Sequence, residues 1–320
     1  MMKDASQEVG WEWNKSYIVV DAVSMARRAS NNDKSFTSSY NPQLLNELAE
    51  VMFDCPEKPS DFSFSVKSVP QLHSKICLTS GGADSTIAWY QSGKPQGLYI
   101  DIGQPYAEKE RSALARLGIP HHYVDMRGTH LASRTWKHII PGRNFLFLGV
   151  AAEMLKNQGE IIFSVVDGEG LNSGKGDKSY KFITLFEDWY RRVTGKYLRV
   201  ITMGERTKAG WLKWFVDEGH DINIIRYDTV TCFSGDVYQC GECQACLRKF
   251  LSFMSLGMDI SADFVAYPMF GAAEYVQKYQ IKLKEALTNL DFSHYSQQRC
   301  IEDLQAIYDA QKLMVEGRSS

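Results

Sequence analysis

Short apolar runs alternate with longer amphipathic stretches from about Lys75 to Asp259. The runs are rich in β-branched and aromatic residues and are followed by turn-forming residues, which is typical of strands. We predict five such strands, at residues 75–78, 97–100, 122–124, 161–166 and 197–202. Because helical stretches separate them, this order favours a doubly wound α/β fold, in which helices cover both faces of a parallel sheet.

The stretches between the predicted strands follow the helical period of 3.6 residues. We expect helices from near Ser85, over 106–117, from Phe145 to about 157–159, and from Lys208 onward. Gly118 directly follows the second of these stretches, and glycine at that position commonly ends a helix. The predicted core is therefore a regular alternation of strands and helices.

Two segments flank this core. Residues 1–70 form an N-terminal extension that contains one predicted strand at 17–20 and then a polar, loop-like stretch. Residues 261–320 form a C-terminal extension with two helical periods, at 275–290 and 296–314. The remaining residues, 71–260, form the predicted α/β core. Extensions of this kind are typical of a partner surface, an oligomer contact or a lid.

The composition is that of an ordinary soluble protein. Of the 320 residues, 44% are hydrophobic and 23% are charged, and the formal net charge is -2. A nearly neutral chain argues against an extended surface for polyanions such as genomic nucleic acid. The N-terminus lacks the apolar stretch of a signal peptide, and no segment reaches the ~20 apolar residues that cross a bilayer. We therefore expect a cytoplasmic protein that does not contact a membrane.

Residues 80–85 read Ser-Gly-Gly-Ala-Asp-Ser and lie between a predicted strand and the start of a helix. Two glycines let the backbone turn sharply and bring N–H groups close to an anion, and the helix points its positive end at the same place. The segment lacks the Gly-Lys-Ser/Thr of a Walker A loop, so we expect it to bind the pyrophosphate part of ATP as a leaving group. The alternative is a tight turn with a helix N-cap at Asp84 or Ser85.

Four of the seven cysteines are clustered, at Cys232, Cys240, Cys243 and Cys246. Thiolates at this spacing can close a tetrahedral Zn²⁺ site, and a four-ligand site has no open position for water, so the predicted role is structural. The alternatives are buried free thiols or a redox Cys-x-x-Cys pair. A reducing cytosol disfavours a disulfide framework.

Two further segments carry groups suited to nucleotide or substrate. Residues 141–144 read Pro-Gly-Arg-Asn, and the guanidinium of Arg143 offers a fixed fork of donors for a carboxylate or phosphate. The alternative for this segment is a turn and helix cap. Lys208 opens a predicted helix and could meet a phosphate, or it could lie on the solvated surface.

Taken in order, these segments resemble the signatures of the QueC (7-cyano-7-deazaguanine synthase) family of PP-loop ATP pyrophosphatases. The resemblance covers about residues 75–259 and rests on residues 80–85, Gly103-Gln104, residues 141–144, and the cysteine cluster followed by Leu247-Arg248. It implies an adenine-nucleotide α-hydrolase (PP-loop, HUP-like) fold of strand order 3-2-1-4-5. In that order the first strand lies at a switch point, where a crevice for ATP opens beside the glycine loop.

The resemblance also implies which residues bind and act. ATP would be contacted by Leu78, Thr79, Ser80, Gly81, Gly82, Asp84, Ser85, Gln104, Arg143 and Asn144. The catalytic residues would be Ser80, Asp84, Ser85, Arg143 and Lys208. Mg²⁺ on the ATP phosphates and Zn²⁺ on the four clustered cysteines complete the implied set.

The chain departs from the family pattern in one region. Family members that form the nitrile carry an acidic, Tyr-Pro-Asp-Cys-Arg-like stretch after the fourth strand. Here residues 167–178 are rich in glycine, that pattern is largely absent, and only Asp177 and the nearby Phe182 align with it. The resemblance is therefore weakest where the 7-deazaguanine ring would be recognised.

The resemblance implies an ATP-dependent carbon–nitrogen ligase. Such an enzyme adenylates a carboxylate, here 7-carboxy-7-deazaguanine, and takes nitrogen from an amine donor to give an amide or nitrile. Three alternatives stay open: an enzyme that attaches a deazaguanine to a protein or nucleic acid in antiphage defence, a sulfur-transferring enzyme such as a tRNA thiolase, and a non-enzymatic nucleotide-binding scaffold. We expect a homo-oligomer, with a protein partner bound through the extensions.

Overall fold

The computed structural model describes residues 72–127, 140, 142–234 and 238–316. The N-terminal extension, with its predicted strand at 17–20, lies outside the described residues. So does Pro141 of the predicted Pro-Gly-Arg-Asn segment.

Within these residues the centre of the fold is a five-stranded parallel sheet. Its strands are β1 (His73–Leu78), β2 (Gln96–Asp101), β3 (His121–Asp125), β4 (Leu155–Val166) and β5 (Tyr197–Met203). They are arranged in the order β3-β2-β1-β4-β5, and every neighbouring pair is parallel. The predicted α/β fold and its strand order are confirmed. The carboxyl ends of β1 and β4 flank the point where the order reverses, which is where open α/β sheets bind ligands.

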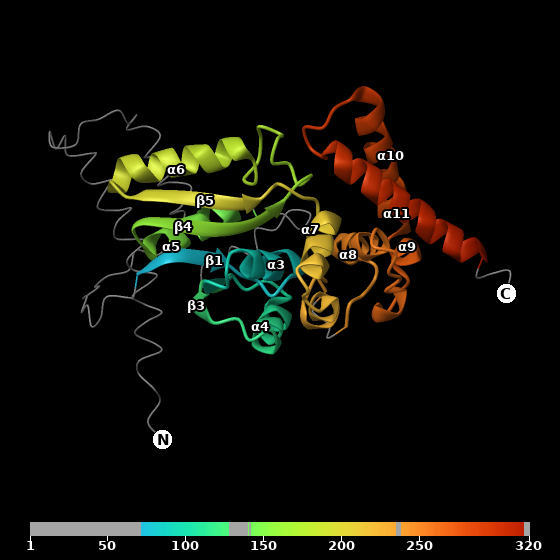
Figure 1. The fold of residues 1–320 in the computed structure, drawn as a ribbon, viewed down its shortest axis with the longest axis horizontal. Coiled ribbons are helices and arrows are strands. Elements are labelled where there is room, and N and C mark those ends of the chain that lie inside the picture. The colour runs from blue at the N-terminus through green and yellow to red at the C-terminus, as the bar shows by residue number, and fades with distance from the viewer. Residues whose placement is uncertain (1–71, 128–139, 141, 235–237, 317–320) are drawn as a thin grey trace, which may run out of the picture. The chain divides into compact units, whose positions relative to one another are not determined.

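Helices connect the strands, as Figure 1 shows. They are α3 (Ala83–Gln91), α4 (Ala107–Arg116), α5 (Arg143–Glu153), α6 (Tyr180–Thr194) and α7 (Lys208–Asp217). Both α3 and α5 pack against β1 and β4. The sequence predicted all of these except α6. This helix buries a face that includes the aromatic residues Phe186 and Tyr190.

One predicted boundary is wrong. The apolar helix expected to reach 157–159 ends at Glu153, and β4 begins at Leu155. The first residues of β4 are fixed by long-range pairing, since Leu155 is in register with His73 and Gln158 with Tyr197. Periodicity within a short window does not report such pairing, because a buried strand and a buried helix are both apolar.

The rest of the described chain is helical. It comprises a short π-helical turn at Ile224–Asp228, α8 (Gln244–Met254), a 3₁₀ turn at Ser261–Asp263, α9 (Pro268–Gly271), α10 (Ala273–Asn289) and α11 (Gln297–Glu316). The last two match the helical periods predicted at 275–290 and 296–314.

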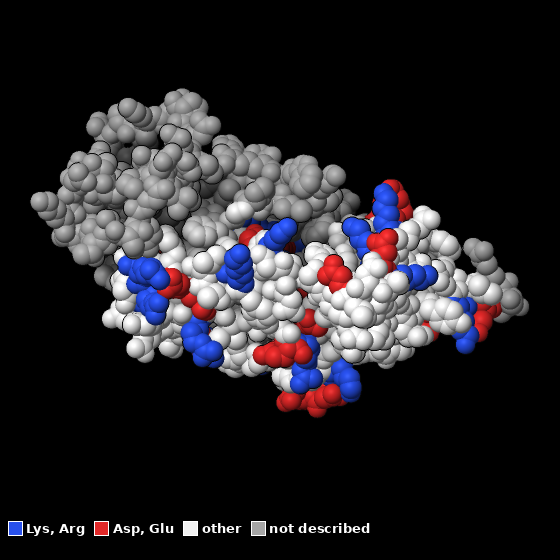
Figure 2. All heavy atoms as spheres, turned by 90° about the horizontal axis from the view of Figure 1, so that it is seen from above, with Lys and Arg blue, Asp and Glu red and all other residues white. Residues whose placement is uncertain are grey.

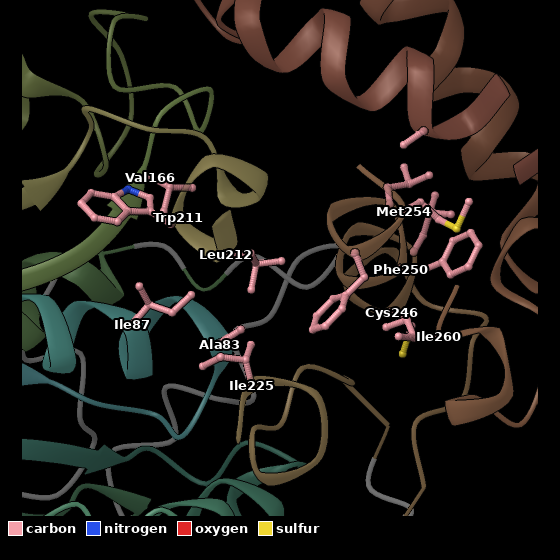
Figure 3. Packing of buried hydrophobic residues seen from close by; sticks show 14 of the residues in the cluster. Ala83, Ile87, Val166, Trp211, Leu212, Ile225, Cys246, Phe250, Met254 and Ile260 are labelled. Carbon is pink, nitrogen blue, oxygen red and sulfur yellow. The ribbon is translucent and has the colours of Figure 1, made fainter. Parts of the chain in front are cut away.

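Among the described residues, a cluster of buried hydrophobic side chains joins the sheet region to these helices. Figure 3 shows it passing from Ile87 on α3 through Leu212 on α7 to Phe250 on α8. The same cluster includes Leu283 of α10 and Ile307 of α11, both fully buried. The C-terminal helices therefore pack onto the region that follows β5.

The surface of the described residues carries mixed charge. On the face that Figure 2 presents, Lys and Arg side chains are interspersed with Asp and Glu rather than gathered into a patch of one sign. Among the described helices, none combines the length and the apolar character that a membrane span requires.

Candidate active site

The turn after β1 is a tight, hydrogen-bonded loop. The Ser80 N–H donates to Ser85 Oγ at 3.2 Å, and the Ser85 hydroxyl donates to the Gly82 carbonyl at 3.1 Å. Gly81 has φ of +67°, and a Cβ placed on it would lie 2.8 Å from the Cβ of Ala113 on α4. Only glycine fits there, because both the conformation and the close approach exclude a side chain.

The loop leads directly into the N-terminus of α3. The N-cap residue is Gly82, and no side chain caps the first turn of the helix. The first N–H groups of a helix lack partners within it and favour an anion. The loop therefore has the form of a phosphate cradle at the carboxyl end of β1.

Lys208 lies at this cradle. Its Nζ is 2.8 Å from Asp84 Oδ2, and the two side chains are 14% and 24% exposed. Lys208 is the first residue of α7, where a cation opposes the helix dipole. The Asp84 carboxylate offsets this unfavourable interaction, and the Lys208 side chain is largely buried rather than spread over the solvated surface.

Arg143 is the first residue of α5. Its guanidinium hydrogen-bonds the Tyr106 hydroxyl, and its charge acts on Glu110. The Glu110 carboxyl in turn accepts hydrogen bonds from Gln104 Nε2 at 2.5 Å and from Tyr99 OH at 3.0 Å. The backbone carbonyl of Glu110 lies against Gly81. Glu110 thus interacts with both Arg143 and Gln104, next to the glycine loop.

Glu110 is a functional candidate that the sequence reasoning missed. Burial raises its pKa to about 7, although hydrogen bonds from Gln104 and Tyr99 and the charge of Arg143 act in the opposite direction. A carboxyl group with a pKa near neutrality can both accept and release a proton under working conditions. Its only sequence signal is its position one turn into the helix after Gly103-Gln104.

The raised pKa predicts a pH-dependent effect of Glu110→Gln on stability. Because the folded pKa lies above the unfolded value, folding favours the protonated carboxyl, and stability falls as pH rises from about 4.5 to about 7. The variant should therefore gain thermal stability relative to the unmodified protein between about pH 5 and about pH 8. Glu108→Gln, at an exposed position on the same helix, is the control. If the Tm of Glu110→Gln differed from that of the unmodified protein by the same amount at about pH 5 and about pH 8, the raised pKa of Glu110 would be contradicted.

Three other predicted contacts line the same edge. Leu78 is the last residue of β1, and the buried Thr79 hydroxyl has no hydrogen-bond partner among the described residues. Asn144 is buried, and its Nδ2 donates to the Asp177 carbonyl at 3.5 Å. The structure thus places Asn144 beside the segment that follows β4, whereas the Thr79 hydroxyl is buried against Gly97 of β2.

The four predicted zinc ligands come together. Their Sγ atoms all lie within 4.8 Å of one another, and Cys240 and Cys246 are 3.9 Å apart. A tetrahedral site with Zn–S bonds of about 2.3 Å requires sulfurs about 3.8 Å apart, so the donor set fits Zn²⁺. Hydrogen bonds among these thiols lower the pKa of Cys232 and raise those of Cys243 and Cys246, so the three groups titrate as one cluster.

The cysteine cluster is joined to the glycine loop. The Val230 N–H donates to the Gly81 carbonyl at 2.9 Å, and the Val230 carbonyl packs on Gly82. Cys232 follows two residues later. On the same segment, the ring of Phe233 contacts that of Tyr106, with centroids 5.7 Å apart. A metal that fixes Cys232 would therefore also brace the loop.

Comparison with known proteins agrees with this architecture. A family model described as "Queuosine biosynthesis protein QueC" matches residues 111–257. The 7-cyano-7-deazaguanine synthase of Paracoccus denitrificans is 28% identical over 212 residues, covering 57% of this chain and 89% of that protein. The synthases of Leptospira interrogans and Methanothermobacter thermautotrophicus are 27% and 25% identical, covering 63% and 59% of this chain and 96% and 98% of their own.

This chain is therefore similar to the QueC family over residues 111–257, and to full-length 7-cyano-7-deazaguanine synthases at 25–28% identity. The family model ends at residue 257, before α9, α10 and α11. The matched relatives are covered almost completely, whereas a large part of this chain has no counterpart in the alignments.

Proposed function

We propose that this chain is an ATP-dependent carbon–nitrogen ligase that adenylates a carboxylate. The observation that carries the proposal is the glycine loop at the switch point of the sheet, with the Asp84–Lys208 pair at its rim and Arg143 nearby. The relatives named as 7-cyano-7-deazaguanine synthases support 7-carboxy-7-deazaguanine as the carboxylate.

The reaction has two parts. A carboxylate oxygen attacks the α-phosphorus of ATP, which forms an acyl-adenylate and releases pyrophosphate. Ammonia then attacks the acyl carbon, AMP leaves, and the product is an amide. A second ATP activates the amide oxygen in the same way, and loss of AMP and a proton gives the nitrile.

The residues have distinct proposed roles. The N–H groups of residues 80–85 would hold the departing pyrophosphate, and Lys208 would neutralise its charge. Arg143 would orient the carboxylate or the α-phosphate through its planar fork. Glu110, with a pKa of about 7, is suited to take the proton that ammonia releases on attack.

Two metals belong to the proposal. Mg²⁺ would supply charge neutralisation on the phosphates, and the Asp84 carboxylate is the kind of oxygen ligand that Mg²⁺ prefers. Zn²⁺ on the four cysteines would hold the segment that contacts Gly81, and would take no part in the chemistry.

The proposal is tested by pyrophosphate release from ATP with 7-carboxy-7-deazaguanine and ammonium. We expect release that depends on the carboxylate, and mass spectrometry should show the amide or nitrile. A chain that binds ATP but releases no pyrophosphate with this carboxylate would favour the nucleotide-binding scaffold instead.

A second candidate keeps the adenylation and changes the acceptor to an amine on a protein or nucleic acid, as in an antiphage defence system. It is favoured by residues 167–178, which lack the family's acidic stretch, and by the helices beyond the matched region. A product mass equal to a macromolecule plus the deazaguanine acyl group would select this candidate over the free nitrile.

The remaining expectations depend on the same proposal. ATP and small carboxylates are cytoplasmic solutes, so a cytoplasmic location follows from it. Self-association and a protein partner for the extensions are measured by light scattering and by co-purification of the full chain.

A further inference from the structure

The segment after β4 is attached to the C-terminal helices. The Arg299 guanidinium, which is 7% exposed, donates to the Gly168 carbonyl, and a Cβ on Gly168 would collide with the Arg299 side chain. Two residues later, the Gly170 N–H donates to the His294 carbonyl at 3.1 Å. Arg299 of α11 and His294 of the turn before α11 therefore both hold the beginning of this segment.

Charge holds the same segment from a second side. Glu169 pairs with Lys178 at 2.8 Å and with Arg248 of α8. Although burial opposes ionisation of Glu169, these two cations keep its pKa well below the ordinary value. The ion pair thereby joins Glu169, near the start of residues 168–178, to Lys178 at their end.

The same helix, α11, also reaches the start of α7. The Thr207 hydroxyl donates to Glu302 Oε2 at 2.5 Å and accepts from the Gly210 N–H at 3.1 Å as the N-cap of α7. The next residue is Lys208, which pairs with Asp84 of the glycine loop. A small polar pocket lies between these groups, lined in part by Asp167, Lys208, Arg248, Arg299 and Asp303.

We propose that α11 positions the active site from outside the part of the chain that matches the family, with Arg299 as its principal positioning residue. Arg299 fixes residues 168–178, beside the proposed carboxylate site, while Glu302 fixes the helix start that carries Lys208. This inference rests on the proposed ligase function for its kinetic consequence, but not for its structural one.

Arginine is required at position 299 for a geometric reason. Its Nε is 3.1 Å from both the Tyr279 hydroxyl and Asp303 Oδ2, while a second nitrogen of the same fork reaches the Gly168 carbonyl. A lysine keeps the charge but lacks the planar fork, so it cannot bond α10, α11 and the segment together. Arg299→Lys is therefore the informative variant, and Arg299→Met removes the charge as well.

The test compares both variants with Lys312→Met, an exposed cation on the same helix. Hydrogen–deuterium exchange in residues 168–178 should be faster in both Arg299 variants and unchanged in Lys312→Met. The KM for 7-carboxy-7-deazaguanine should rise about tenfold, with the KM for ATP within about twofold. Should Arg299→Met fail to fold, Arg299→Lys decides the matter.

Unchanged exchange together with an unchanged carboxylate KM in Arg299→Lys would overturn the inference. If the unmodified protein releases no pyrophosphate, the ligase proposal fails, and the exchange measurement alone decides whether Arg299 positions the segment. Glu302→Ala should lower kcat several-fold through the start of α7, with the carboxylate KM within about twofold. An unchanged kcat in that variant would remove Lys208 from the elements that α11 positions.

Discussion

Asp84→Ala should lower the rate of pyrophosphate release about 100-fold while the protein remains folded. The substitution removes the carboxylate that lies 2.8 Å from Lys208, so the lysine loses the partner that holds it at the rim of the glycine loop. It also removes the oxygen ligand proposed for Mg²⁺. The measurement is steady-state pyrophosphate release at saturating ATP, with circular dichroism as the check on folding.

The chain offers a matched control for this variant. Asp217 pairs with Lys213 at 3.0 Å, but that pair lies on the exposed face of α7. Exposed pairs of this kind contribute little, so Asp217→Ala should retain the full rate. Ser80→Ala should behave like Asp84→Ala, because it removes the hydroxyl that the loop's own N–H and Ser85 contact. A full rate in Asp84→Ala would exclude this loop as the catalytic site.

Cys243→Ser should reduce both zinc content and thermal stability, with a Tm lower by about 5 to 10 °C. Cys243 is the N-cap of α8, and serine caps a helix at least as well, so the variant removes the thiolate and keeps the cap. Because Val230 bonds Gly81 two residues before Cys232, ATP affinity should fall together with the zinc content. The measurements are metal analysis, thermal unfolding and ATP calorimetry on one preparation.

Cys300→Ser is the control for the metal. Cys300 is buried on α11, away from the cluster, so its replacement should affect stability and leave zinc content unchanged. A Cys243→Ser protein that retained all of its zinc would show that the ligand set is wrong. If it lost zinc but bound ATP as before, the proposed bracing of the glycine loop would be wrong.

The elements that the sequence predicted correctly are those with local signals. Apolar runs between glycine-containing turns located all five strands, and the helical period located α10 and α11. The cysteine spacing predicted a cluster whose sulfurs do meet. The strand order came from the family resemblance, because nothing in a single strand reports its neighbours in the sheet.

The elements that the sequence did not predict depend on long-range contacts. The start of β4 is set by pairing with β1 and β5, and Glu110 gains its raised pKa only when the fold buries its carboxyl beside Tyr99 of β2. Arg299 lies 131 residues from the carbonyl that it bonds. No local period or motif encodes such a pair, so the C-terminal helices could be predicted as helices but not as part of the site.

The central claim is that the loop after β1 binds the diphosphate of ATP. The most direct measurement is a crystal structure of the full chain with the non-hydrolysable analogue α,β-methylene-ATP. We predict the β- and γ-phosphates within hydrogen-bonding distance of the N–H groups of residues 80–85, with Lys208 beside them. A nucleotide bound elsewhere, with this loop empty at saturating analogue, would contradict the account.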